Sequence, residues 1–267
     1  MVRFIGHNDV KSILELAIDY YHTENNPVAN YFRLVRRHKA CVSVDEQGHI
    51  AGFILLCQAV FLIDEAEQCD CWFVFKEYCK NGDAKDLHSF AKTNIAEPII
   101  YVPSHFADYD KTTYHKFATR KLCVLEKSEC ETAKLPFSSL SAKQLVTYRK
   151  KVMSQKTLLW GYDVAQLLVE SYKHNNMMPY LIGSGENKCL IICKKESEIL
   201  TIYEFLSEKN VAQAVMKVAD AVMAYFGVGK ALFYLHSNTQ LDASVQQYAF
   251  VNTNMIPFST DNYVFIE

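Results

Sequence analysis

The hydrophobic positions near the start of the chain recur with the spacing of one helix face. Asn8 or Asp9 can cap this predicted helix, because a side-chain oxygen at that place accepts hydrogen bonds from free backbone amides. The apolar positions are Val10, Ile13, Leu14, Ala17, Ile18 and Tyr21. A second helix is predicted over residues 27–38.

The period then changes to two, which is typical of strands. Gly48 supplies the positive φ that a hairpin turn favours between the first two of these strands. The predicted strands cover residues 39–44, 50–58 and 70–79. The rest of the first half is predicted as a short helix around Leu87, a strand over 98–103, a helix over 110–120 and a strand over 121–127.

The second half repeats this order of elements. After an extended segment at 134–140, Ser141 can cap a helix that continues to Met153. A capping-box pattern at Asn210 and Gln213 starts a later, longer helix. In chain order the other predicted elements are a helix over 161–175, a hairpin over 179–195, strands over 199–206 and 230–236, a helix over 242–252 and a strand over 262–267.

This repetition predicts two similar domains of the α/β (α+β) class. The polar stretch at 127–134 separates the two sets of elements, as expected of a domain boundary. The predicted domains are therefore residues 1–130 and residues 134–267.

Charge and hydropathy narrow the classes of partner. The 267 residues include 28 basic and 30 acidic side chains, so a formal net charge of −2 gives no general attraction to nucleic acid. The densest basic run, at 33–39, lies at the end of a predicted helix, where cations complement the helix dipole. No apolar run reaches the roughly 20 residues of a membrane span, and the first residues lack the pattern of a secretory signal. We expect a cytoplasmic protein that binds neither nucleic acid nor membrane.

The nine cysteines are expected to be reduced thiols, most of them small side chains of the core. None of them has the paired spacing of a structural zinc site, so no metal is expected. Glycine-rich loops of the Rossmann or Walker type are absent from the sequence as well.

The element order resembles that of GNAT-type N-acyltransferases, in tandem and over essentially the whole chain. In that family a mixed, mostly antiparallel sheet is flanked by helices, and two parallel strands splay apart to admit acyl-coenzyme A. The pyrophosphate lies at the start of the helix between these strands, and the pantetheine arm lies in the gap like an added strand. Here the splayed strands correspond to 199–206 and 230–236, and in the first half to 70–79 and 98–103.

The resemblance implies acetyl-CoA or another acyl-CoA as the cofactor. Carried over to this sequence, the cofactor-binding residues are Phe205, Leu206, Ser207, Lys209, Asn210 and Val211. The loop departs from the family pattern R/Q-x-x-G-x-G/A, because it has no glycine and carries Glu208, which repels a pyrophosphate. Lys209 and the free amides at the helix start still attract an anion.

The first half departs further, because Asp83 and Asp86 fall in the first turn of its equivalent helix. The second half has no carboxylate between Asn210 and Met216 and is the better candidate for the active domain.

Three residues of the second half are candidates for catalysis. The resemblance places Tyr248, and Tyr114 in the first half, where the family uses a tyrosine to protonate the departing thiolate. Glu204 lies in a strand that would face the acceptor amine and can serve as a general base, and His236 at the end of the next strand is a candidate for the same role. Each also has a structural interpretation, as a half-buried aromatic residue or as a solvated polar one.

Two functions stay open at this point. The first is an acyl-CoA-dependent N-acyltransferase, in particular an acetyltransferase, that acts on a small-molecule or peptide amine. The second is a catalytically inactive GNAT-like protein that binds a partner or forms a homodimer. Transfer from an aminoacyl-tRNA would require a basic groove, which the charge balance does not support.

Overall fold

The computed structural model describes residues 1–80, 84–102, 114–128, 134–153, 156–185, 188–236 and 238–251. The first half contains, in chain order, β1 (Val2–Phe4), α1 (Asp9–Tyr21), α2 (Pro27–Leu34), β2 (His38–Val44), β3 (Ile50–Leu62), β4 (Gln68–Cys79), α3 (Lys85–Asn94), β5 (Ile99–Tyr101) and β6 (His115–Glu126). The second half contains β7 (Phe137–Ser139), α4 (Ala142–Val152), β8 (Thr157–Trp160), α5 (Tyr162–His174), β9 (Met178–Ile182), β10 (Cys189–Glu196), β11 (Ile199–Ser207), α6 (Val211–Phe226), β12 (Lys230–His236) and β13 (Ser244–Val251). Apart from β8, the two halves have the same order of elements, so the repetition that the sequence predicts is present.

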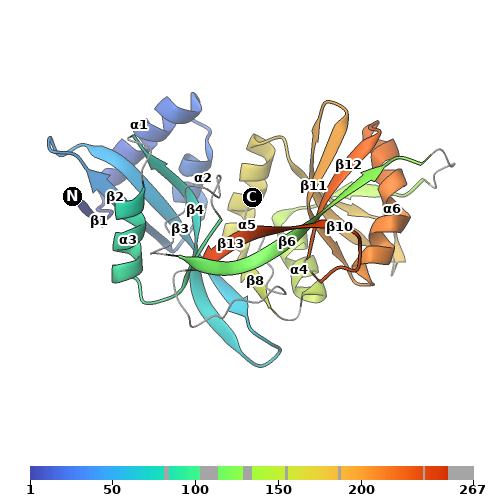
Figure 1. Cartoon of the computed structure of the whole chain (residues 1–267). Helices are drawn as coiled ribbons and strands as arrows, with labels where there is room; N and C mark the ends of the chain where they lie inside the picture. The colour runs from blue at the N-terminus through green and yellow to red at the C-terminus, as the bar shows by residue number, and fades with distance from the viewer. Residues whose placement is uncertain are drawn as a thin grey trace.

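The strands of both halves form one mixed, mostly antiparallel sheet (Figure 1). Within the described residues its order is β1-β2-β3-β4-β5-β13-β6-β12-β11-β10-β9-β7, with β8 paired to β3. The two parallel pairs among these strands are β4–β5 and β11–β12. They are the two pairs that the resemblance assigns to the splayed positions.

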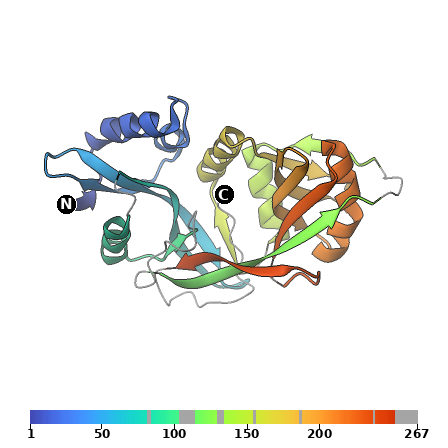
Figure 2. The ribbon, with the colours of Figure 1, turned by 45° about the horizontal axis from the view of Figure 1, so that its top comes forward.

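Each half gives its closing strand to the other half. β13, at the end of the second half, pairs with β5 of the first half, and β6 pairs with β12 of the second. The two exchanged strands also pair with each other, and Figure 2 shows them crossing together from one half to the other. The predicted bounds 1–130 and 134–267 stay a prediction, because residues 129–133 lie outside the described part of the chain.

Two predicted helices are wrong, and both errors concern these exchanged strands. The residues at 115–120 and 244–251 are in β6 and β13 instead of in helices. Each is a central strand that pairs on both sides, and such long-range pairing overrides a weak local preference for helix. The predicted strand at 262–267 lies outside the described residues.

One hydrophobic core runs through both halves. It joins side chains of α1, α2 and β2–β4 to side chains of α4, α5 and β8, with Tyr31, Phe61, Leu145 and Tyr172 fully buried. Smaller clusters lie under α6 in the second half and under α3 in the first. The halves are therefore joined by shared packing as well as by the exchanged strands.

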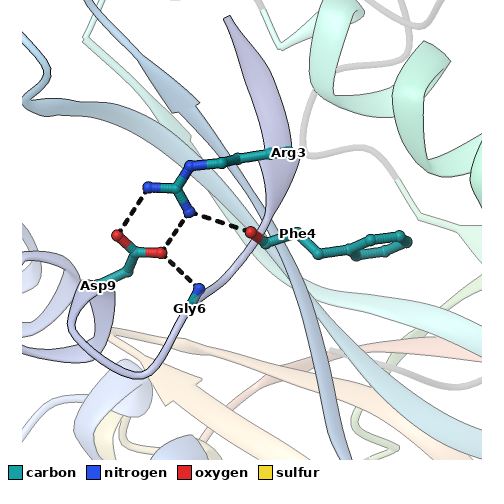
Figure 3. A network of polar contacts seen from close by, with 4 residues as sticks. All are labelled: Arg3, Phe4, Gly6 and Asp9. Atoms are coloured by element: carbon teal, nitrogen blue, oxygen red, sulfur yellow. Dashed lines mark hydrogen bonds and ion pairs between the residues drawn. The ribbon is translucent and has the colours of Figure 1, made fainter.

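A polar contact fixes the start of the chain against α1 (Figure 3). The Asp9 carboxylate accepts hydrogen bonds from the Arg3 guanidinium at 2.5 and 2.9 Å and from the Gly6 backbone N–H at 2.5 Å. Asn8 occupies the N-cap position without a side-chain hydrogen bond to the helix. The hydrogen bond from Arg3 lowers the pKa of the Asp9 carboxyl.

Candidate active site

The parallel strands β11 and β12 separate part-way along their length. Their ladder runs from the pair Ile199–Lys230 to the pair Ile202–Phe233 and ends there. β12 then continues beside β6 through His236, while β11 continues beside β10 through Ser207. This divergence produces the gap that the resemblance predicts.

A bulge in β11 marks the point of divergence. Ile192 and Cys193 of β10 pair with Glu204 and Ile202, so Tyr203 is the extra residue in the ladder. Bulges bend a strand and redirect its side chains, and they are over-represented beside functional sites.

Aromatic rings cross the gap on both faces of the sheet. Phe205 of β11 packs edge-on against Phe233 of β12, with ring centroids 5.9 Å apart, on the face that α6 covers. Tyr203 stacks on Tyr234, and the Arg120 guanidinium lies 3.7 Å above the Tyr234 ring. Aromatic side chains therefore line both faces of the sheet at this point, with the Arg120 guanidinium beside Tyr234.

The loop that follows β11 leads into the start of α6. Ser207 Oγ accepts a hydrogen bond from the Lys209 backbone N–H, and the Asn210 side chain caps the helix by accepting from the Gln213 N–H at 3.1 Å. The first turn of α6 contains no acidic residue. Lys209 is exposed and Val211 is half-buried.

A cavity of about 240 Å³ borders this helix start. Ser207, Lys209, Gln213 and Lys217 supply its polar lining. Ser184 adds to this polar lining, and the other lining residues are Leu135, Gly183, Cys189, Ala214 and Val218, none of which belongs to β12. Of the predicted cofactor residues, Ser207 and Lys209 line this cavity, whereas Phe205 and Leu206 are buried in the core.

Glu204 is completely buried and forms an ion pair with Arg149 of α4. Arg149 also donates to the Leu158 carbonyl at 3.1 Å and lies 4.0 Å from the centre of the Trp160 ring. A general base must reach solvent or substrate, and Glu204 can do so only if it first leaves Arg149. The arrangement ties β11 to α4 and β8, and this accounts for a carboxylate in the core.

The other two catalytic candidates lie at the far side of the gap. His236 is half-buried at the end of β12, and its Nδ1 accepts a hydrogen bond from the Asn238 N–H at 3.2 Å. A neutral imidazole that accepts at Nδ1 carries its proton at Nε2, and the role of His236 as a base stays a prediction. The backbone of Tyr248 lies in β13, but its side chain lies outside what the structure describes.

The sequence matches no known protein family, and no curated protein matches it either. Solved structures do match. A probable N-acyltransferase from Enterococcus faecalis has a TM-score of 0.66 at 10% identity, over 94% of this chain and 72% of that one. GCN5-related N-acetyltransferases from Anabaena variabilis and Kribbella flavida have TM-scores of 0.60 and 0.56 at 14% and 11% identity, over 94% of this chain and 72% and 70% of theirs.

The chain has a tandem GNAT-type fold. Identities this low establish the fold and leave the activity open. The resemblance predicts an acyl-CoA site in the gap between β11 and β12 and at the start of α6, and this stays a prediction.

The first GNAT-like half keeps the same geometry but closes its gap. β4 and β5 pair only through Trp72–Ile99 and Phe73–Ile100, and Phe75 is the bulged residue that matches Tyr203. Beyond the last pair, the Tyr101 hydroxyl donates to the Glu77 carboxylate at 2.6 Å. This hydrogen bond spans the space that is bridged by ring contacts in the second half.

The bridge belongs to a chain of four buried or half-buried polar side chains. The second Glu77 oxygen lies 2.6 Å from His88 Nε2, and His88 Nδ1 lies 2.8 Å from the Tyr114 hydroxyl. Burial by itself raises the pKa of Glu77, but the hydrogen bonds from His88 and Tyr101 outweigh it and lower the pKa overall. The Tyr114 hydroxyl, to which the resemblance assigns the role of an acid, is therefore hydrogen-bonded within this buried cluster of polar side chains.

This cluster could not be predicted from the sequence, because its members come from four separate segments. Two features of the sequence nevertheless point to part of the cluster. Glu77 is a charged residue near the end of a buried strand, and the next helix contains a histidine.

Replacing Glu77 with glutamine is expected to lower the free energy of unfolding at pH 7 by about 1–3 kcal/mol, because charge-assisted hydrogen bonds are lost. The pKa of Glu77 is lowered in the folded state, so this stabilisation is present above its unfolded pKa and disappears as pH falls through the folded pKa. Chemical denaturation of both proteins between pH 7 and acid pH measures the difference. A difference that stays constant down to pH 3 would contradict an ionised Glu77 (about 4.3 being its ordinary pKa).

Three of the buried thiols are unsuited to act as nucleophiles. Burial raises the pKa of Cys41 and Cys193 to about 12 and raises that of Cys71 further. A thiol reacts as its thiolate, so these groups are inert at neutral pH.

Two classes of feature are missing from the described part of the chain. No three histidine, cysteine, aspartate or glutamate side chains gather there in a way that could hold a metal ion. None of the helices found there is long and apolar enough to span a bilayer.

Proposed function

We propose that the protein is an acyl-CoA-dependent N-acyltransferase whose second half binds the donor and transfers an acyl group, in particular acetyl, to a small-molecule or peptide amine. The observation that carries the proposal is the gap that opens beyond Ile202 and Phe233, beside a helix start without a carboxylate. In the first half the equivalent gap is crossed by the Glu77–Tyr101 hydrogen bond. The second half is therefore the assigned site of the donor.

In this proposal the acyl chain and pantetheine arm lie in the gap between β11 and β12. The rings of Phe205, Phe233 and Tyr234 supply apolar walls for them. The diphosphate lies at the start of α6, near Lys209 and the first-turn amides. Backbone amides near 205–207 stabilise the oxyanion of the tetrahedral intermediate.

Transfer proceeds by direct attack of a neutral amine. The nitrogen forms a bond to the thioester carbonyl carbon, the carbon–sulfur bond breaks, and the amine proton passes to water. In this proposal Tyr248 donates the proton that the departing thiolate takes up. Tyr248→Phe is therefore expected to lower kcat by about 10²-fold or more. Glu204 acts in this scheme as a positioning residue, because Arg149 holds it in the core.

Acyl-CoA is expected to raise the thermal stability of the protein. A ligand present at 100 times its Kd adds about 2.7 kcal/mol to the free energy of unfolding. Thermal unfolding with acetyl-CoA and with longer acyl-CoAs measures this shift. Val211→Glu is expected to abolish it, since the new carboxylate falls in the first turn of α6, where the diphosphate lies.

Ala224→Glu is the matched control, because it adds the same charge to an exposed position in the last turn of α6. This variant should keep the full shift. Absence of any shift with every acyl-CoA tested at millimolar concentration would rule the proposal out. A shift that survives Val211→Glu would rule out the assigned position of the diphosphate.

A catalytically inactive binding protein is the alternative function. Two observations favour it: Glu204 is sequestered by Arg149, and the first-half gap is bridged. The two functions differ in turnover. Release of free thiol from acetyl-CoA in the presence of a panel of amines supports the enzyme, whereas a thermal shift without thiol release supports the binding protein.

A further inference from the structure

A second cavity, of about 470 Å³, lies where the two halves meet. The first half supplies the end of α2 and parts of β3 and β4, and the second supplies β8, the start of α5 and one residue of α4. Its volume is within the range of sites for small molecules. Neither acyl-CoA gap contributes to its lining.

Three cations line this cavity: Arg36, Arg37 and Lys150. All three are exposed, and within the described residues none has a hydrogen bond or an ion pair from its side chain. The one lining carboxylate, Asp163, accepts from the Arg36 backbone N–H at 3.3 Å and from the Val164 N–H at 2.9 Å. The chain as a whole has a formal net charge of −2, so the excess of two positive charges is a local property of this cavity.

A buried donor without a partner lies in the same wall. Trp160 is only 3% exposed and lines the cavity, and its Nε1–H has no hydrogen-bond acceptor in the described part of the chain. The Nε1 atom itself is buried, so Trp160 contributes its ring to the wall of the cavity. The Arg149 guanidinium lies over the ring of the same tryptophan.

The remaining lining divides into amide groups and apolar groups. Gln58 and Gln68 add further donors at the strand side, and the start of α5 opens on the cavity at Gly161. Val35, Val60, Leu62 and Leu159 supply apolar walls. The site is therefore rich in donors and positive charge on one part of its wall and apolar on the rest.

We propose that this cavity between the halves binds a small molecule that carries an oxyanion, either a phosphate or a carboxylate, on an apolar body. Arg36, Arg37 and Lys150 neutralise the oxyanion, and the Trp160 ring forms part of the wall beside them. The apolar body lies against Leu159 and the valine and leucine side chains of β3. This site does not depend on acyl transfer.

Isothermal titration calorimetry without any acyl-CoA tests the proposal. Phenyl phosphate and benzoate are the two anionic probes, and benzyl alcohol is the neutral probe with the same ring. At least one anion is expected to bind, and the anion that binds more tightly identifies the class of ligand. Binding should weaken as salt is added, because the cations are exposed.

The variant Arg36→Gln/Arg37→Gln is expected to weaken anion binding by about tenfold or more. Lys143→Gln is the matched control, because Lys143 is an exposed cation on α4 that does not line the cavity. Circular dichroism checks that each variant is folded.

Three results would overturn the proposal. The first is that neither anion binds, and the second is that benzyl alcohol binds as tightly as the anions do. The third is that the arginine variant binds the anions as tightly as the wild type and Lys143→Gln do.

Discussion

Replacing Arg149 with methionine is expected to lower the free energy of unfolding by about 3–5 kcal/mol, because it leaves the carboxylate of Glu204 buried without its cation. Arg149 and Glu204 are 1% and 0% exposed, so water cannot take over the lost interaction. The Leu158 carbonyl loses its donor from Arg149 as well. Urea denaturation monitored by circular dichroism measures the change. If the m value is unchanged, the shift of the denaturation midpoint gives the change in the free energy of unfolding.

Two further variants separate the charge effect from lost packing. Arg149→Met/Glu204→Leu removes both charges and is expected to recover most of the stability, because a well-packed apolar pair often replaces a buried ion pair without loss. Lys151→Met is the control on the same helix: it breaks the ion pair with Glu208, but the Lys151 side chain is 64% exposed, so a change within about 1 kcal/mol is expected. If Arg149→Met lowered the free energy of unfolding no more than Lys151→Met does, the assigned role of Arg149 would be wrong.

Placing a carboxylate at Ala249 is expected to be more damaging still. Ala249 is completely buried in β13, and its partner in β6 is Ala118, which is also completely buried. Ala249→Asp therefore brings an unpaired charge into the core that joins the two halves, at a cost of several kcal/mol. We expect this variant to unfold or to aggregate at room temperature, as circular dichroism and size-exclusion chromatography would show.

Val245→Asp is the control for this prediction. It introduces the same side chain in the same strand, four residues earlier, where Val245 is 61% exposed. A change within about 0.5 kcal/mol is expected there. If both variants were equally stable, β13 would not lie in the buried centre of the sheet.

Because β6 and β13 are exchanged between the halves, a substitution that disrupts β13 affects the stability of both halves. β13 completes the edge of β5, and β6 completes the edge of β12. A strand edge without a partner exposes unpaired backbone groups and favours aggregation. Loss of β13 should therefore destabilise the first half together with the second.

The repeated order of elements could be predicted from the sequence because it rests on local signals. The helix that starts at Ser141 is an example: its capping box with Gln144 is present in the structure. The start of α6 at Asn210 and its end at Gly227, where φ is +64°, follow in the same way from cap and glycine chemistry. The parallel pairs β4–β5 and β11–β12 are expected only from the resemblance to GNAT-type N-acyltransferases, and the structure contains both.

Strand identity at the centre of the sheet could not be predicted in the same way. Residues 115–120 and 244–251 lack a decisive local pattern, and they become strands because each lies between two partners from distant parts of the chain. β8 is missed for a related reason: its four residues pair with β3, almost one hundred positions earlier. Neither effect leaves a signal within a short window of sequence.

The candidate site shows the same division. The repeated order of elements and the absence of a carboxylate in the first turn of the second-half helix come from the sequence, because they depend on periodicity and on the residues themselves, whereas the position of the gap between 199–206 and 230–236 comes from the resemblance to GNAT-type N-acyltransferases. Only the tertiary structure decided that Glu204 is neutralised by Arg149, that the first gap is bridged by Glu77 and Tyr101, and that Arg36, Arg37 and Lys150 meet in one cavity. The physical reason is that burial and charge pairing depend on which distant segments pack together, and in this chain the closing strand of each half packs in the other.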